Sequence, residues 1–78
     1  MSAKEMFEQL GYEQKMDTIG MYYYRFSSKY EKDNYSGHNW ENTIRFDSYR
    51  KNIYSDKYIN LQLLQAINKQ VEELHWND

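Results

Sequence analysis

The chain has 78 residues, with 10 lysines and arginines against 12 aspartates and glutamates, and a formal net charge of −2. It contains no cysteine, which excludes disulfides and thiolate metal sites and favours a reducing compartment. It also lacks an apolar run long enough for a membrane helix or a signal peptide. We therefore expect one small domain over residues 1–78, located in the cytoplasm and away from membranes.

Residues 3–10 predict a short first helix. Ser2 followed by Glu5 forms a capping-box pattern, and apolar residues then recur at helical spacing. Gly11 suits the left-handed position that ends a helix, and Tyr12 after it can fold back as in a Schellman motif. Residues 13–18 are interpreted as a polar connector.

Residues 18–28 predict the first strand, in which both alternating faces are aromatic or aliphatic. Taking Phe26 as inward places Tyr22 and Tyr24 against the core as well. The pattern itself does not determine which face is buried. Because tyrosine and arginine are enriched at interfaces, we assign the second face to partner binding. That face carries Ile19, Met21, Tyr23 and Arg25.

The polar segment 29–39 connects the first strand to the second. It is rich in turn-forming residues and long for a hairpin connection, so we expect it to take part in recognition. Tyr35 and His38 are its candidate contact residues.

Residues 40–47 predict a second strand with cleanly alternating faces, and residues 52–55 predict a short third strand at the sheet edge. Arg45 points outward in this interpretation and joins Arg25 on the recognition face. The residues expected to point inward are Trp40, Ile44, Phe46 and, on the third strand, Ile53.

Residues 61–75 predict the last helix, with Asn60 as its N-cap. The fold class is therefore α+β, in the order α-β-β-β-α, with a three-stranded antiparallel sheet and helices packed on it. Trp76 either closes the edge of the core or anchors an interface, and the sequence leaves both open. The stripe expected to face the core is Leu61, Leu64, Ile67, Val71 and Leu74.

Residues 3–12 (AKEMFEQLGY) and 64–74 (LQAINKQVEEL) resemble the two ends of small uncharacterised proteins from phages and prophages of Gram-positive bacteria. The resemblance covers about a third of the chain and involves its helical ends alone. It implies a bacterial host cytoplasm. Small acidic proteins of that origin often occupy a surface on a host protein, including inhibitors of CRISPR effectors, so the resemblance implies an anti-CRISPR-like inhibitor as one specific hypothesis.

No residue set predicts a reaction or a metal site. His38 and His75 lie 37 residues apart in the sequence, and the three glycines stand alone, without a phosphate-binding loop. No serine lies in a nucleophile motif. We therefore predict a protein that is not an enzyme and needs neither metal nor cofactor.

These patterns favour a module that binds a host protein, such as a defence protein or a nucleic-acid-processing protein. Two alternatives stay open. A single-stranded nucleic-acid binder would stack bases on the tyrosines and arginines of the sheet. Residues 25–57 hold seven basic and five acidic side chains, which is a weak excess for neutralising phosphates. The second alternative is a homodimeric structural protein.

Overall fold

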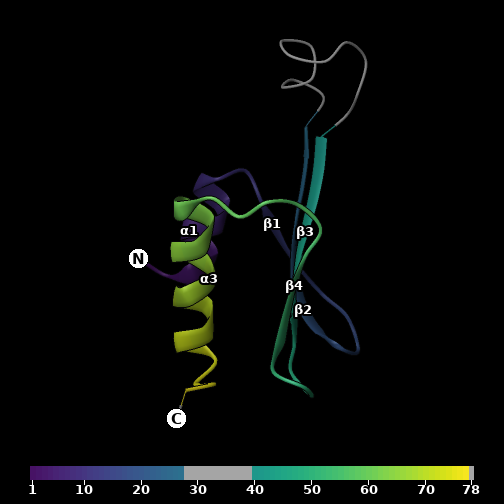
Figure 1. The fold of residues 1–78 in the computed structure, drawn as a ribbon, viewed down its shortest axis with the longest axis vertical. Helices are drawn as coiled ribbons and strands as arrows, with labels where there is room; N and C mark the ends of the chain where they lie inside the picture. Colours follow the sequence, from purple (N-terminus) through teal and green to yellow (C-terminus); the bar gives the residue numbers. More distant parts are fainter. Residues whose placement is uncertain (28–39, 78) are drawn as a thin grey trace.

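The computed structural model describes residues 1–27 and 40–77. Over these residues the chain forms two helices and a four-stranded antiparallel sheet with the strand order β1-β2-β3-β4. Both helices lie on the same side of the sheet, which gives two layers (Figure 1). The predicted α+β class is confirmed. The elements are α1 (Ala3–Gln9), β1 (Glu13–Met16), β2 (Gly20–Ser27), β3 (Trp40–Asp47), β4 (Asn52–Ser55) and α3 (Leu61–Glu73).

The prediction of a three-stranded sheet is wrong, because the supposed polar connector contains β1. Its residues pair with β2 from Glu13 opposite Tyr24 to Met16 opposite Met21. As an edge strand it needs few apolar side chains, so its sequence lacks the alternation that marks a strand. β4 forms the other edge, as predicted. Its Ile53 pairs with Phe46 on the helix-covered side but is only partly covered.

The start and end of α1 match their predicted signals. The backbone N–H of Glu5 donates to Ser2 Oγ at 3.2 Å, and the N–H of Ser2 donates back to Glu5 Oε1 at 2.9 Å. Gly11 takes a left-handed φ of +92°, and the N–H of Tyr12 donates to the carbonyl of Phe7 at 3.0 Å. These contacts are those of a Schellman motif.

The last helix begins as predicted and ends two residues early. The side chain of Asn60 accepts a hydrogen bond from the backbone N–H of Leu63 at 2.8 Å. At the other end His75 adopts a left-handed φ of +59°, and the N–H of Trp76 returns to the last turn of the helix. A histidine therefore occupies the position that glycine usually takes at a helix end.

The predicted faces of β2 are inverted. Tyr23 is fully buried, whereas Phe26 is 53% exposed. Tyr23 pairs with Ile44 of β3, so these two residues share the helix-covered side, and the inward placement of Ile44 and Phe46 is confirmed. The inward position of Trp40 stays a prediction, because its side chain lies outside the described part of the structure.

The core is a single aromatic and aliphatic cluster between the sheet and the helices. The rings of Phe7 and Tyr23 stack with centroids 3.7 Å apart, and Phe46 meets both rings edge-on. Stacked and edge-on contacts stabilise aromatic pairs beyond the area they bury. The buried members of the cluster are Phe7, Tyr12, Tyr23, Ile44, Phe46, Leu63, Ala66 and Ile67.

The predicted core stripe of α3 is partly wrong. Leu61 is 68% exposed and Leu64 is 44% exposed, whereas Ile67 is buried. The side of α3 that packs against the core instead starts at Leu63. Two leucines at the start of α3 consequently remain on the surface. The buried residues of the helix are Leu63, Ala66, Ile67 and Gln70.

We expect alanine substitutions to separate the two sides of α3. Ile67→Ala removes buried methyl groups and should lower the free energy of unfolding by about 2–5 kcal/mol. Leu64→Ala removes a half-exposed side chain and should cost about 1 kcal/mol or less. Urea unfolding in dilute solution, followed by circular dichroism, measures both. Equal losses for the two variants would contradict the described orientation of the helix.

Candidate functional site on the open face of the sheet

The side of the sheet opposite the helices carries an aromatic surface, which we call the open face. Residues paired across antiparallel strands point to the same side, and Tyr22 pairs with Arg45, which in turn pairs with Tyr54. No described element covers this side (Figure 1). Phe26 and Tyr54 are 53% and 59% exposed. The open face consists of Tyr22, Tyr24, Phe26, Arg45 and Tyr54, with Lys15, Glu13, Glu41 and Thr43 between and around them.

Arg45 organises the centre of the open face. Its guanidinium carbon lies 4.7 Å from the ring centroid of Tyr22, within the range of a cation–π contact. Its Nη1 atom also donates to Asp17 Oδ2 at 2.6 Å. Arg45 therefore fixes the β1–β2 turn to β3 and covers one face of the Tyr22 ring.

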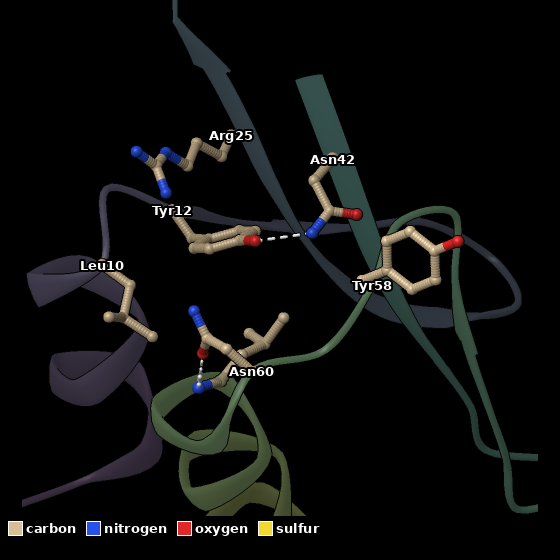
Figure 2. Close-up of a pocket in the computed structure, with 7 residues that line it drawn as sticks. Leu10, Tyr12, Arg25, Asn42, Tyr58 and Asn60 are labelled. Carbon is tan, nitrogen blue, oxygen red and sulfur yellow. Dashed lines mark hydrogen bonds between the residues drawn. The ribbon is translucent and has the colours of Figure 1, made fainter. Parts of the chain in front are cut away.

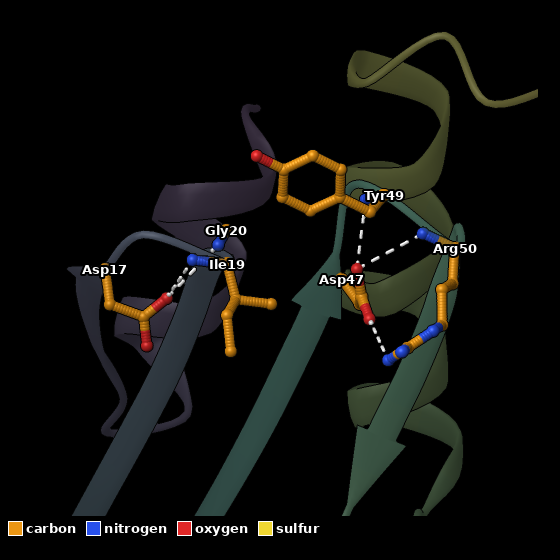
Figure 3. A network of polar contacts seen from close by, with 6 residues as sticks. All are labelled: Asp17, Ile19, Gly20, Asp47, Tyr49 and Arg50. Atoms are coloured by element: carbon orange, nitrogen blue, oxygen red, sulfur yellow. Dashed lines mark hydrogen bonds and ion pairs between the residues drawn. The ribbon is translucent and has the colours of Figure 1, made fainter.

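Asp17 in turn orders the backbone of that turn. Its Oδ1 atom accepts hydrogen bonds from the N–H groups of Ile19 and Gly20 at 3.0 and 3.1 Å (Figure 3). Gly20 is required there because a Cβ atom would lie 2.3 Å from the carbonyl oxygen of Phe46. The bond from Arg45, together with these backbone bonds, lowers the pKa of the Asp17 carboxyl group.

A second aspartate orders the neighbouring turn between β3 and β4 (Figure 3). Asp47 Oδ1 accepts from the N–H groups of Tyr49 and Arg50 at 2.9 and 3.2 Å, and its Oδ2 pairs with Arg50 Nη1 at 3.5 Å. Because Gly20 pairs with Asp47, both turns lie at the same end of the sheet. The two aspartates fix this end of the open face.

Ion pairs within the sheet neutralise several of its cationic groups. Besides the pairs of Arg45 and Arg50, Lys15 Nζ lies 3.3 Å from Glu13 Oε2. The hydroxyl group of Tyr24 donates to Glu41 Oε2 at 3.2 Å. Burial and this carboxylate raise the pKa of Tyr24. The open face is thus aromatic with balanced charge.

A small polar cavity lies on the helix-covered side (Figure 2). Its volume is about 60 Å³. Asn42, which is 1% exposed, donates from Nδ2 to the hydroxyl oxygen of Tyr12 at 2.6 Å, while its Oδ1 atom has no partner within the described residues. Burial raises the pKa of Tyr12. This volume accommodates water and is far below that of a drug-sized ligand site. The lining also includes Leu10, Arg25, Tyr58, Asn60 and Leu63.

The structure separates the residues that the sequence grouped into one recognition surface. Tyr23 is buried in the core, so its predicted outward position is wrong. Arg25 pairs with Asn42 on the helix-covered side, where its guanidinium carbon lies 6.0 Å from the ring centroid of Tyr12. Arg45 alone of the two arginines lies on the open face. The predicted Arg25–Arg45 pair is therefore split between opposite sides of the sheet.

The remaining predicted contact residues lie elsewhere. Trp76 is half-buried, and its ring packs against Phe46 with centroids 6.1 Å apart, which supports the core-closing alternative. Tyr35 and His38 lie outside the described residues.

The sequence interpretation missed the outward positions of Tyr22, Tyr24, Phe26 and Tyr54. The alternation of Ile53 and Tyr54 in β4 could have revealed the last of these. For the first three, the useful signal was the Asp17–Gly20 turn pattern, because it implies a preceding strand. In the resulting register the charged residues Glu13 and Lys15 lie opposite Tyr24 and Tyr22, which marks that side as the outer one.

The described residues contain no group of three or more His, Cys, Asp or Glu side chains arranged to hold a metal ion. Among the described helices, none combines the length and the apolar character needed to cross a membrane. Comparison with protein-family models, with curated proteins and with solved structures gives no match.

We expect the Asp17 carboxyl group to titrate below its usual value of 3.8 because Arg45 stabilises the charged form. Arg45→Gln should raise this pKa toward 3.8. Since folding lowers the pKa, the stabilising effect of the ionised group is complete above the unfolded value and is lost as pH falls through the folded one. Carbon-detected NMR titration of wild type and variant measures both values. An unchanged pKa in the variant would show that the ion pair does not form in solution.

Proposed function

We propose that this chain is a non-enzymatic protein-binding module and that the open face of its sheet contacts the partner. The observation that carries the proposal is that Tyr22, Tyr24, Phe26, Tyr54 and Arg45 share one side of the sheet, which no described element covers. Contiguous exposed aromatic surface on a small domain typically marks an interaction site. Tyrosine and arginine are also the residue types that most often dominate binding energies at interfaces.

The chemistry of the open face favours a partner with an apolar surface and a polar rim. Phe26 and Tyr54 can bury their rings against apolar side chains, while the tyrosine hydroxyl stays at the wet edge. Arg45 is already held by Asp17 and Tyr22, so little side-chain entropy is lost when it is covered. The face is thus preorganised for a protein surface.

The same ion pairs argue against single-stranded nucleic acid as the partner. Lys15, Arg45 and Arg50 each lie beside a carboxylate, and the chain as a whole has a formal charge of −2. Phosphate binding derives most of its free energy from unmatched cations that displace counterions. Aromatic stacking alone would leave such binding weak.

As part of the same proposal, we place the partner in a bacterial host, because the helical ends resemble small proteins of Gram-positive phages. Occupation of a surface on a host defence or nucleic-acid-processing protein would then block that surface. The helices that carry the resemblance form the layer opposite the open face. In this proposal the helices serve as the scaffold, and the open face binds the partner.

A paired substitution tests the proposal. Phe26→Ala with Tyr54→Ala removes the two most exposed aromatic rings of the open face, and Tyr49→Ala with Tyr58→Ala removes two exposed rings elsewhere. We expect the first variant to keep its melting temperature within a few degrees of wild type, because both rings are half-exposed. Its affinity for the partner should fall at least about thirtyfold, whereas the control should bind like wild type.

The partner is first captured from a Gram-positive lysate by wild type and by the control, then purified and titrated against all three proteins by calorimetry. A partner that binds the open-face variant and wild type equally would refute the assigned surface. A loss of folding in that variant would show that these rings are structural.

A second measurement addresses nucleic acid directly. We expect no detectable binding of labelled single-stranded oligonucleotides near physiological salt, because Lys15, Arg45 and Arg50 each lie beside a carboxylate. Fluorescence anisotropy over a salt series measures this. Submicromolar affinity at that salt, lost in the Phe26→Ala and Tyr54→Ala variant, would replace the protein partner with a nucleic acid.

A further inference from the structure

The polar cavity on the helix-covered side, which we call the Asn42 cavity, contains a hydrogen-bond acceptor that the fold leaves unpaired. Asn42 is 1% exposed and donates from Nδ2 to the hydroxyl oxygen of Tyr12, while its Oδ1 atom has no partner within the described residues. Figure 2 shows this Oδ1 atom pointing away from Tyr12 and toward Tyr58, another residue of the lining. Because a buried carbonyl oxygen without a hydrogen bond is costly, the cavity favours a ligand that brings a donor.

Asn60 supplies a donor to the same cavity. Its Oδ1 atom accepts from the backbone N–H of Leu63 at 2.8 Å, which fixes the orientation of the side-chain amide. Its Nδ2 atom consequently points the other way, toward Tyr12 (Figure 2). The cavity therefore presents an acceptor on Asn42 and a donor on Asn60.

The charges beside the cavity have opposite signs. Arg25 lines it, with its guanidinium carbon 6.0 Å from the ring centroid of Tyr12. Burial has the largest effect on the pKa of Tyr12 and raises it; of the two nearby charged groups, Arg25 lowers this pKa and Asp56 raises it. A ligand with a net charge would be attracted by one of these groups and repelled by the other. The site therefore favours a neutral polar group.

We propose that the Asn42 cavity binds a primary carboxamide, the terminal group of an asparagine or glutamine side chain on another protein. The N–H of this group donates to Asn42 Oδ1, and its oxygen accepts from Asn60 Nδ2. A carboxylate lacks the donor, an ammonium group lacks the acceptor, and an aliphatic group lacks both.

The size of the cavity supports this choice. Its volume of about 60 Å³ corresponds to roughly two water molecules, and the oxygen and nitrogen of one carboxamide take the places of two waters. A hydroxyl group would replace only one of them. An aromatic ring or a nucleobase needs more space, since a cavity of roughly 150 Å³ is the size that encloses benzene.

The same volume favours a side chain over a free amino acid. It holds the terminal group and leaves no room for an additional ammonium and carboxylate group. Tyr58 at the rim is fully exposed, so a side chain can enter from solvent, and the exposed ring can contact its stem. A group this small binds weakly by itself, so the remaining affinity has to come from the chain that carries it.

This inference goes beyond the proposed function and does not rest on the open face. Asn42 pairs with Arg25 on the side of the sheet that the helices cover. The cavity and the open face are therefore separate sites, and each can be tested without the other.

Titration of the full chain with acetamide, acetate and acetone, followed by proton–nitrogen NMR, tests the ligand class. The three molecules have nearly the same size, but only acetamide combines an N–H donor with an acceptor. We expect acetamide to shift the side-chain amide resonance of Asn42 with a dissociation constant of about 10 mM, the weak affinity of a very small ligand. Acetate and acetone should bind at least about tenfold more weakly.

Two variants locate the binding site. Asn42→Leu removes the unpaired oxygen and should abolish saturable binding of acetamide while the native spectrum is kept, because an apolar side chain of similar size is tolerated in a buried position. The control is Tyr54→Ala, which removes an exposed ring on the open face and should bind acetamide like wild type. If Asn42→Leu does not fold, intermolecular NOEs in wild type from the acetamide methyl group to Tyr12 and Leu63 replace it, and their absence refutes the site.

Blocked peptides identify the source of the carboxamide. A short peptide with a central glutamine, blocked by acetyl and N-methylamide groups, should bind at least as tightly as acetamide, and its glutamate counterpart at least about tenfold more weakly. Free glutamine should bind more weakly than this peptide, because its two charged groups would have to lose water at the rim. Tighter binding of free glutamine would overturn the assignment to a protein side chain.

The remaining outcomes are equally decisive. Saturable binding of acetate without binding of acetamide would make the cavity an anion site. No saturation by any of the three molecules up to about 300 mM would show that the cavity holds water only. Either result overturns the carboxamide site and leaves the protein-binding proposal intact, because the latter is measured with a different ligand and with variants of the open face.

Discussion

The placement of Tyr23 is the constraint on which the rest of the structure depends. Its ring stacks on Phe7 of α1, and its hydroxyl group donates to Gln70 Oε1 of α3 at 2.6 Å and accepts from Gln14 Nε2 of β1 at 3.1 Å. One side chain of β2 thereby contacts both helices and the neighbouring strand. Because a buried phenol needs its partners, the two carboxamides fix the position of α3 and β1 relative to the sheet. Phe46 of β3 completes the arrangement by meeting the Tyr23 ring edge-on.

The open face follows from this placement. Side chains alternate along a strand, so an inward Tyr23 forces Tyr22 and Tyr24 to the other side. A chain of 78 residues buries only roughly 60–65% of its unfolded surface, and its two helices cover one side of the sheet. The aromatic rings on the uncovered side could therefore not be buried by a shift in the pairing of β2 without exposing Tyr23. Their position is set by the same register that completes the core.

The parts of the fold that were predictable from sequence are those with local signals. Both helix starts and the end of α1 depend on a few neighbouring residues, and β3 and β4 have the predicted bounds because their faces alternate. The register of β2 was not predictable from three consecutive tyrosines, since either face could be the buried one. The predicted orientation of α3 was wrong for a related reason. Its buried side includes Gln70, a residue that hydrophobic patterns assign to solvent, while Leu61 and Leu64 lie outside.

The wrong predictions for β2 and α3 share one physical feature. Polar side chains are buried where apolar ones were expected, and apolar side chains lie on the surface. Asn42 and Gln70 are buried, whereas Phe26 and Leu61 are more than half exposed. In natural sequences the local propensities, the hydrophobic pattern and the packing mostly specify the same structure. Departures concentrate where function competes with folding. The buried carboxamides are explained within the fold, since each bonds to a tyrosine hydroxyl. Within residues 1–27 and 40–77, burial in the core does not account for the positions of Phe26, Leu61 and Leu64, which remain exposed. They lie on opposite layers of the fold, and binding of another molecule at the open face, as proposed above, would remove the exposed rings from water.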